Sequence, residues 1–379
     1  MDKYAQLLAE MTAAGTLGTE WRSAFERAPR SAFLPNAVWT PDPDEPTGYR
    51  RTTLAADPEG WWALANADDV VVTQVDDGTA IGPGVATSSA SVPTLVAVML
   101  RHLDVVDGHT VLDVGTGTGW TSALLCARLG DHNVTTIEVD PNLAAEAAHR
   151  LRAAGFAPTC AVGDGLAGWP LDAPYDRIHS TAAVQRIPLP WLRQTRPGGV
   201  IVTPWGTPYA NAGLLRLTVG APDAASHGRF VDAVSFMWMR AHRPDVPTAA
   251  PAAPTAPTHL SPSAIDPDLA LETVHAAFAI GLRVPGVRYQ HRWDPADPST
   301  TYRIQLTDAA GSLATARHHR WQAPDAVRQS GPRRLWDEVT AARSWWLEDG
   351  RPDLTRFGVT VDPDGTQTVW LDDPDHPVT

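Results

Sequence analysis

Length, composition and charge set the first limits on this chain. With 379 residues, 43% of them hydrophobic, it is long enough for two folded domains with buried cores. Its formal net charge of −13 argues against a nucleic-acid partner, because neutralising phosphates requires a basic surface. No apolar run reaches membrane-spanning length, and the N-terminal segment lacks the apolar core of a signal peptide, so we expect a cytoplasmic protein without membrane contact.

The first eighty residues predict a helical segment followed by an insertion. Amphipathic patterns predict helices over residues 4–14 and 19–27. The polar, proline-rich stretch 41–62 predicts an insertion or flap, and residues 70–75 predict a short strand.

A run of small and hydroxyl-bearing residues follows, at 81–92, and leads into a helix that ends near His102. We expect this run to be a loop. Ser91 precedes Val-Pro and an apolar periodic pattern, which is typical of the N-cap of a helix. Hydroxyl groups and free backbone N–H groups at such a helix start favour a bound anion.

Residues 110–120, Thr-Val-Leu-Asp-Val-Gly-Thr-Gly-Thr-Gly-Trp, predict a buried strand, a tight glycine turn and the start of a helix. In a dinucleotide-binding fingerprint a third glycine or alanine stands where this chain has Trp120, so a pyrophosphate-binding turn is excluded. With Gly115, Gly117 and Gly119 behind Asp113, the turn resembles the first motif of class I S-adenosylmethionine (SAM) methyltransferases.

The next elements are consistent with a ligand at this turn. Residues 134–138 predict a second strand, with Glu138 at its carboxyl end, where a carboxylate can accept hydrogen bonds from ribose hydroxyls. Asp140 and Pro141 predict the start of the following helix. A third strand ends at Gly163-Asp164-Gly165.

Motifs along the first two thirds of the chain together resemble the protein-L-isoaspartate O-methyltransferases. They are Phe33-Leu34-Pro35, Ile81-Gly82, the Ser-x-Pro-x-x-Val-Ala run 91–97, the glycine turn, Gly163-Asp164-Gly165, residues 174–179 (Pro-Tyr-Asp-Arg-Ile-His) and residues 196–199 (Arg-Pro-Gly-Gly). The resemblance implies a Rossmann-like α/β sheet with helices on both faces, and transfer of the SAM methyl group to an aspartyl or isoaspartyl carboxylate of a peptide or protein. A methyl ester formed there can collapse to a succinimide.

The resemblance also implies roles for individual residues. Contact with the acceptor carboxylate is expected from Ser91, with Ser89 and Thr87 as further candidates. Contact with SAM is expected from residues of the three strand ends: Asp113, Gly115, Thr116, Gly117, Gly119, Glu138, Asp164 and Gly165. No metal ion is expected, because an ionised carboxylate can attack a sulfonium methyl group without one.

Plainer interpretations stay open for the same residues. The glycines suit any tight turn, and Glu138 suits a solvated strand end. Ser91 can serve only as a helix cap, and Asp164 only as a turn residue. We expect His179 to be a packed core histidine, and His318 and His319 to be surface residues without a carboxylate partner.

The chain is expected to divide at a proline-alanine stretch. We predict an N-terminal segment at 1–80, a SAM-binding core at 81–242, an extended linker at 243–264 and a smaller α+β domain at 265–379. Two strands at 213–219 and 230–239 are expected to complete the core sheet. The last domain predicts helices at 269–280 and 331–346, and strands at 302–306 and 366–371.

The C-terminal domain leaves the substrate open. It is rich in tryptophan, which favours either a core-packing module or a peptide-holding surface. The chain also resembles actinobacterial relatives with such extensions, which methylate one Asp of a ribosomally synthesised peptide. Peptide tailoring is therefore the alternative to isoaspartyl repair, and a non-catalytic SAM-binding scaffold is a third, different class.

Overall fold

The computed structural model describes residues 3–42, 44–45, 48–79, 84–244, 258–293 and 302–378. Two compact units make up the chain: Met1–Ala182 with Ile187–Thr203 and Arg216–Ala224, and Ala183–Arg186 with Pro204–Leu215 and Ala225–Thr379. The motif Ile81-Gly82 and most of the predicted linker, 245–257, lie outside the described residues. Among the described helices, none has the length and hydropathy needed to cross a membrane.

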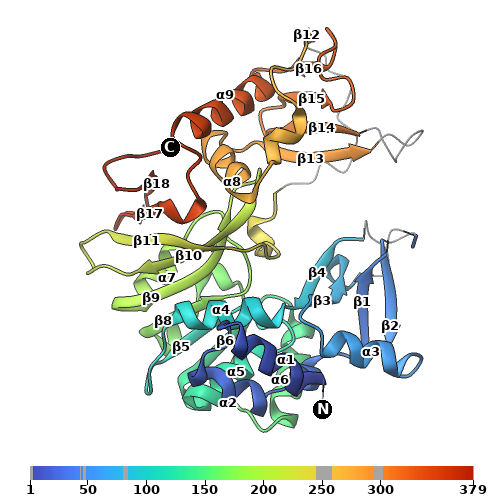
Figure 1. Ribbon diagram of the computed structural model, residues 1–379. Coiled ribbons are helices and arrows are strands. Elements are labelled where there is room, and N and C mark those ends of the chain that lie inside the picture. Colours follow the sequence, from blue (N-terminus) through green and yellow to red (C-terminus); the bar gives the residue numbers. More distant parts are fainter. Residues whose placement is uncertain are drawn as a thin grey trace. The chain divides into compact units, whose positions relative to one another are not determined.

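The first unit begins with the helices α1 (Lys3–Ala13) and α2 (Thr19–Arg27), as predicted (Figure 1). Described residues of the predicted insertion contribute β2 and most of α3 to a region built on a four-stranded sheet with the order β2-β1-β3-β4. Its strands and the helix between them are β1 (Ala37–Pro41), β2 (Tyr49–Thr53), α3 (Pro58–Ala65), β3 (Val71–Val75) and β4 (Ala86–Ala90). Asp57 begins α3 by accepting a hydrogen bond from the Gly60 N–H, which is a local capping signal.

A parallel sheet forms the centre of the first unit, and its strand order creates a switch point. The neighbours of β5 (Val111–Val114) are β6 (Val134–Glu138) on one side and β8 (Tyr175–Ser180) on the other. The connections on either side of β5 therefore leave in opposite directions, and ligands of open α/β sheets bind in the crevice at such a point. The remaining elements here are α4 (Pro93–Leu103), α5 (Trp120–Leu129), α6 (Pro141–Ala153), β7 (Thr159–Val162), α7 (Leu189–Gln194) and β9 (Thr195–Gly206).

The central sheet has nine strands, in the order β18-β17-β11-β10-β9-β8-β5-β6-β7. We predicted that β10 (Asn211–Thr218) and β11 (Ser226–Ala233) complete it, and this is wrong, because β17 (Phe357–Val361) pairs with β11 and β18 (Gln367–Leu371) pairs with β17. The last strands of the chain thus extend a sheet whose other strands precede residue 234.

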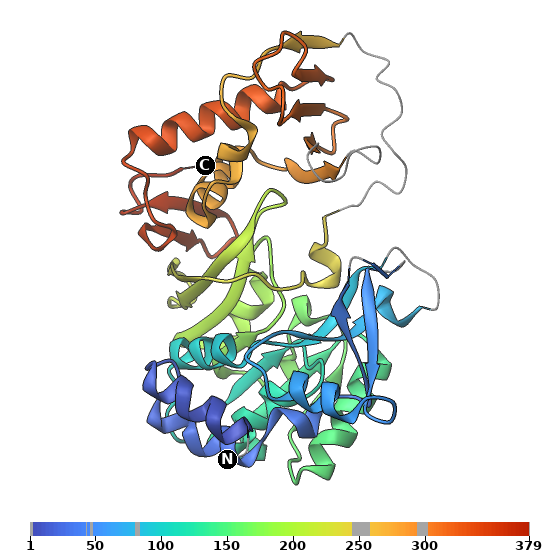
Figure 2. The ribbon, with the colours of Figure 1, turned by 45° about the vertical axis from the view of Figure 1, so that its right-hand side comes forward.

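The second unit also contains a separate five-stranded sheet, in the order β12-β16-β15-β14-β13. The five strands of this sheet are β12 (His259–Ser261), β13 (Arg288–Trp293), β14 (Tyr302–Thr307), β15 (Leu313–Arg317) and β16 (Val327–Ser330). The helices in the same stretch of chain are η7 (Pro267–Leu271), α8 (Val274–Arg283) and α9 (Leu335–Glu348). β12 lies within the predicted linker and pairs with β16. Figure 2 shows α8 and α9 on one side of these strands.

Candidate active site

The glycine turn lies at the carboxyl end of β5, at the switch point of the sheet. Gly115, Gly117 and Gly119 all have positive φ angles, of 89°, 53° and 89°. A Cβ atom on Gly119 would lie 3.2 Å from Leu151 Cγ, so Gly119 allows α5 to begin close against α6. Trp120 faces away, and its indole N–H donates a hydrogen bond to the Ala28 carbonyl at 2.9 Å.

Asp113 lies beneath this turn and is completely buried. One of its carboxylate oxygens accepts a hydrogen bond from the Ser122 hydroxyl at 2.6 Å, and the other lies 2.9 Å from Nδ1 of His179. We predicted Asp113 as a residue that contacts SAM. In this arrangement its carboxylate is enclosed by protein groups and joins the first turn of α5 to β8, while His179 is the packed core histidine that we expected.

Thr116 belongs to the same buried layer. Its hydroxyl lies 2.7 Å from the hydroxyl of Thr136 on β6, and Thr136 in turn lies 3.1 Å from the Ser122 hydroxyl. These bonds join the turn, the start of α5 and the neighbouring strand. The turn is therefore held in one conformation before any ligand binds, which favours affinity.

Glu138 reaches the turn from the end of β6, as its position in the sequence predicted. One carboxylate oxygen accepts a hydrogen bond from the Gly117 N–H at 2.9 Å, and the other accepts one from the Asp140 N–H at 3.1 Å. The side chain is 8% exposed. Each oxygen retains a lone pair, so the carboxylate can still accept hydrogen bonds from a ligand at this edge.

Asp164 and Gly165 follow β7 at the same edge of the sheet. Asp164 is exposed and accepts a hydrogen bond from the Leu166 N–H at 3.0 Å, so it begins a short 3-10 helix. Gly165 is buried, and its carbonyl accepts a hydrogen bond from the indole of Trp191 at 2.7 Å. Asp164 thus begins a turn with one carboxylate oxygen, and its second carboxylate oxygen accepts no hydrogen bond from a described residue. Its contact with SAM stays a prediction.

The segment that carries the hydroxyl groups differs from our prediction. Residues Ala86–Ala90 form the strand β4 rather than a loop, because they pair antiparallel with β3. The N-cap of α4 is Val92, without a side-chain hydrogen bond, so the prediction that Ser91 caps this helix is wrong. The Ser91 hydroxyl is therefore not occupied by a capping bond.

β4 lies directly beside the glycine turn. A Cβ atom on Gly117 would lie 3.7 Å from the Ser88 hydroxyl oxygen and 3.9 Å from the Ser89 carbonyl oxygen. Residues about thirty positions apart in the chain thus lie next to each other. The hydroxyl-bearing residues and the predicted cofactor loop meet here, as the proposed chemistry requires.

The four hydroxyl groups of this segment differ in their hydrogen bonds and in their burial. Thr87 donates to Gln74 Oε1 at 2.9 Å, and Ser88 is buried and accepts a hydrogen bond from Thr73 at 3.2 Å. By contrast, no described residue hydrogen-bonds to the hydroxyl of Ser89 or Ser91, and both residues are partly exposed. Ser89 and Ser91 are therefore the hydroxyls available to an acceptor carboxylate, and Thr87 is less available.

Sequence analysis did not identify Gln74. Its amide group donates to Asp140 Oδ2 at 3.2 Å and accepts from the Thr87 hydroxyl, so it joins β4 to the start of α6. A single glutamine on a predicted strand carries no signal of such a bridge, because the two partners lie 13 and 66 residues away.

Arg30 was also missed. It is completely buried, and its five N–H groups donate to five backbone carbonyl groups, those of Leu64, Ala65, Ala67, Asp69 and Ser91, at 2.6–3.2 Å. Burial lowers the pKa of this guanidinium to about 10, so it stays charged at neutral pH. It fixes the backbone of Ser91 relative to the connection between α3 and β3.

Replacing Arg30 by lysine is expected to lower the free energy of unfolding by about 2 kcal/mol, because an ammonium group has three donors and leaves buried carbonyl groups unpaired. Urea unfolding followed by circular dichroism measures this. Arg22→Lys, which changes a partly exposed arginine of α2, is the matched control and should cost well under half as much. Equal losses in the two variants would show that the five bonds are not important for stability.

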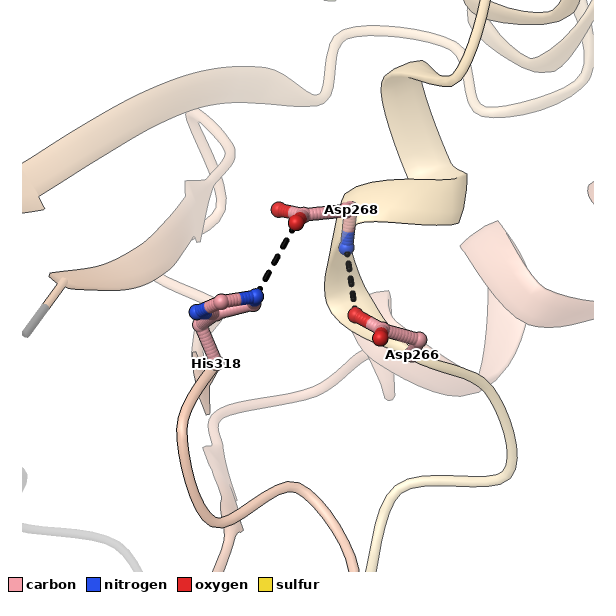
Figure 3. A group of neighbouring side chains, drawn as sticks. All are labelled: Asp266, Asp268 and His318. Atoms are coloured by element: carbon pink, nitrogen blue, oxygen red, sulfur yellow. Dashed lines mark hydrogen bonds and ion pairs between the residues drawn. The ribbon is translucent and has the colours of Figure 1, made fainter. Parts of the chain in front are cut away.

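The second unit brings together a group that the sequence did not suggest, Asp266, Asp268 and His318 (Figure 3). We expected His318 to lack a carboxylate partner, and this is wrong, because its Nε2 lies 2.9 Å from Asp268 Oδ2. Asp266 accepts a hydrogen bond from the Asp268 N–H at 3.1 Å and so begins η7. The contact between His318 and Asp268 holds η7 against the segment that follows β15.

Comparisons with a family model and with known proteins agree on one family. The model of the family described as "Protein-L-isoaspartate(D-aspartate) O-methyltransferase (PCMT)" matches residues 72–237. A protein-L-isoaspartate O-methyltransferase of Rhodospirillum rubrum is 35% identical over 221 residues, which cover 58% of this chain and 84% of that protein. One of Thermococcus onnurineus (strain NA1) is 42% identical over 127 residues, or 33% of this chain.

The shorter of these matches is partial. The chain spans 56% of the length of the Thermococcus onnurineus protein, little more than half. A solved structure titled "Protein-L-isoaspartate O-methyltransferase" is similar with a TM-score of 0.54 and 16% identity, and the similarity covers 98% of this chain and all of that one. This likeness concerns the fold alone, and it includes the region after the proline-alanine stretch.

Proposed function

The chain belongs to the protein-L-isoaspartate O-methyltransferase family, and we propose that it transfers the methyl group of SAM to an isoaspartyl carboxylate of a peptide or protein. The observation that supports this most is that β4, with its hydroxyl groups, lies next to the glycine turn. The free hydroxyls of Ser89 and Ser91 lie on a segment that contacts the Gly117 turn.

The residues at the strand ends suit SAM as the methyl donor. When bound, SAM supplies a methyl group on a positively charged sulfur. The Gly117 turn leaves room for a ligand because it has no side chain, and Glu138 offers a carboxylate next to it. Asp164 offers a second, exposed carboxylate at the end of β7.

The acceptor side needs positioning rather than a base. A carboxylate with an ordinary pKa of about 4 is ionised at neutral pH, so its oxygen can form the new bond to the methyl carbon directly. The electron pair of the broken carbon–sulfur bond stays on sulfur, and no proton is transferred. Ser89 and Ser91 would hold the carboxylate by hydrogen bonds. The start of α4 adds little, because Pro93 has no N–H and the Thr94 N–H already donates to Asp68 at 2.9 Å.

This chemistry predicts a reaction that needs no divalent ion, since the attacking carboxylate is negatively charged and the sulfur that carries the methyl group is positively charged. Treatment with EDTA followed by desalting is expected to leave the rate of methyl transfer unchanged. The assay counts methyl groups transferred from radiolabelled SAM. A loss of activity that one added divalent ion restores would contradict the mechanism.

The substrate is tested with matched peptides. One peptide is made with isoaspartate, with aspartate or with asparagine at the same position, and methyl transfer to each is measured. We expect transfer to the isoaspartyl form, followed by loss of methanol as a succinimide closes. Transfer to the aspartyl form alone would favour peptide tailoring, and binding of SAM without transfer to any acceptor would favour a scaffold.

A further inference from the structure

The five-stranded sheet of the second unit has one apolar face and one charged face. Side chains of β14, β15 and β16, such as Leu306, Ala314 and Val327, share a buried core with Trp336 and Val339 of α9. Figure 2 shows α8 and α9 along this side of the strands. Since side chains alternate along a strand, the residues between these positions face the other way.

Arginines form a row across that other face. Arg292 of β13 is directly opposite Arg303 of β14, and Arg303 is directly opposite Arg317 of β15. Directly opposite residues have Cβ atoms about 5 Å apart, and like charges at such positions destabilise a sheet. Arg328 of β16 points to the same face, because its register partner Thr315 lies two residues from Arg317. We call these four residues the arginine row.

Few carboxylates balance the arginine row within the described residues. Arg317 pairs with Asp325 at 2.9 Å, and Arg292 donates to the neutral amides of Gln290 and Gln305. Arg303 and Arg328 are exposed, and neither makes a hydrogen bond or an ion pair with a described residue. Within the described residues these side chains thus form a positively charged face, on a chain with a net charge of −13. Like charges at directly opposite positions lower the stability of a sheet.

We propose that the arginine row is a binding surface for an acidic stretch of polypeptide, in addition to the proposed methyl-transfer site. Guanidinium groups bind carboxylates through two parallel hydrogen bonds. Alternate side chains of an extended peptide lie about 7 Å apart, so two or three Asp or Glu residues span a row of this length. A long phosphate backbone fits less well, because it continues beyond the row to where the acidic remainder of the chain repels it, whereas two or three carboxylates stay within the row.

The test uses the full chain and a fluorescently labelled peptide that contains eight glutamates. Fluorescence anisotropy at low salt is expected to show binding that weakens as salt is added, because the contacts are ionic. A peptide in which glutamine replaces every glutamate should not bind. Arg303→Glu is expected to weaken binding of the acidic peptide on the order of tenfold, since it reverses the central charge of the row.

Arg334→Glu is the matched control. Arg334 is exposed in the same unit and lies at the N-cap of α9, and its side chain has no partner among the described residues. Its reversal changes the net charge by the same amount. It should leave binding within about twofold. The Tm of Arg303→Glu should not fall, because the variant removes two like-charge contacts. An unchanged Tm would show that weaker peptide binding is not caused by unfolding.

Three results would overturn the proposal. The first is equal binding by the Arg303→Glu and Arg334→Glu variants. The second is absence of binding by the unchanged chain at low salt. The third is tighter binding of a single-stranded oligonucleotide of equal charge than of the acidic peptide, which would assign the row to nucleic acid.

Discussion

Gly117→Val is expected to abolish measurable SAM binding while the chain still folds. A side chain at this position would point from the glycine turn toward Ser88 and Ser89, into the space between the two sides of the site. The nearest of these atoms lies 3.7 Å from where a Cβ would stand, which leaves room for one carbon but not for valine methyl groups and a ligand together. We expect the Kd for SAM to rise by a factor of about a hundred or more.

The positive φ angle of Gly117 means that valine there also lowers folding stability, and this effect must be separated from the loss of SAM affinity. A β-branched residue at φ 53° costs about 1–2 kcal/mol of folding stability by itself. Gly155→Val is the matched control, because Gly155 has φ +83° and nothing lies within 4 Å of its Cβ position. Calorimetry should show normal SAM affinity for this control, and equally normal affinity for Gly117→Val would remove the basis for placing SAM at this turn.

Ser91→Ala is expected to lower kcat/KM for methyl transfer about a hundredfold, without a change in the Kd for SAM. A missing hydrogen bond to a reacting group commonly costs about 2–4 kcal/mol in the transition state. The Ser91 hydroxyl has no partner among the described residues, so its removal leaves no buried group unpaired. Steady-state kinetics with an isoaspartyl peptide, and calorimetry with SAM, measure the two quantities separately.

Two variants accompany this measurement. Thr94→Val removes a hydroxyl three residues further along, which donates to Asp68 at 2.6 Å, and should leave kcat/KM nearly unchanged. Ser89→Ala tests the other free hydroxyl. If Ser91→Ala changes kcat/KM by less than threefold and Ser89→Ala lowers it strongly, then Ser89 is the residue that holds the acceptor.

The region after the proline-alanine stretch belongs to a fold that a solved structure shares. A solved structure titled as an isoaspartate methyltransferase is similar in fold over 98% of this chain. What distinguishes this region within the described residues is its charge distribution, above all the arginine row.

Local signals were sufficient for much of the first unit. The turn of Gly115, Gly117 and Gly119 needs positive φ angles, which glycine adopts readily. The Asp140 side chain accepts hydrogen bonds from the first N–H groups of α6, and Pro141 occupies the first helical position. Such features depend on residues a few positions apart. The glycine turn, the strand ends at Glu138 and Asp164, and most helices could therefore be predicted from the sequence.

Contacts between distant residues could not be predicted in this way. The five carbonyl partners of Arg30 lie 34 to 61 residues away, and the enclosure of Asp113 depends on His179, 66 residues further along. The run 86–90 shows no strand pattern of its own, and it becomes β4 because β3 pairs with it.

The sequence by itself determined the kind of site: a glycine turn after a strand, two acidic strand ends and a segment rich in hydroxyls, which together indicate SAM-dependent methyl transfer. Only the tertiary structure decided which of these groups are available. It encloses Asp113, engages Thr87 and leaves the hydroxyls of Ser89 and Ser91 without a hydrogen-bond partner among the described residues. The physical reason is that residue type sets what a group can bind, whereas burial and neighbours far along the chain set what it does bind.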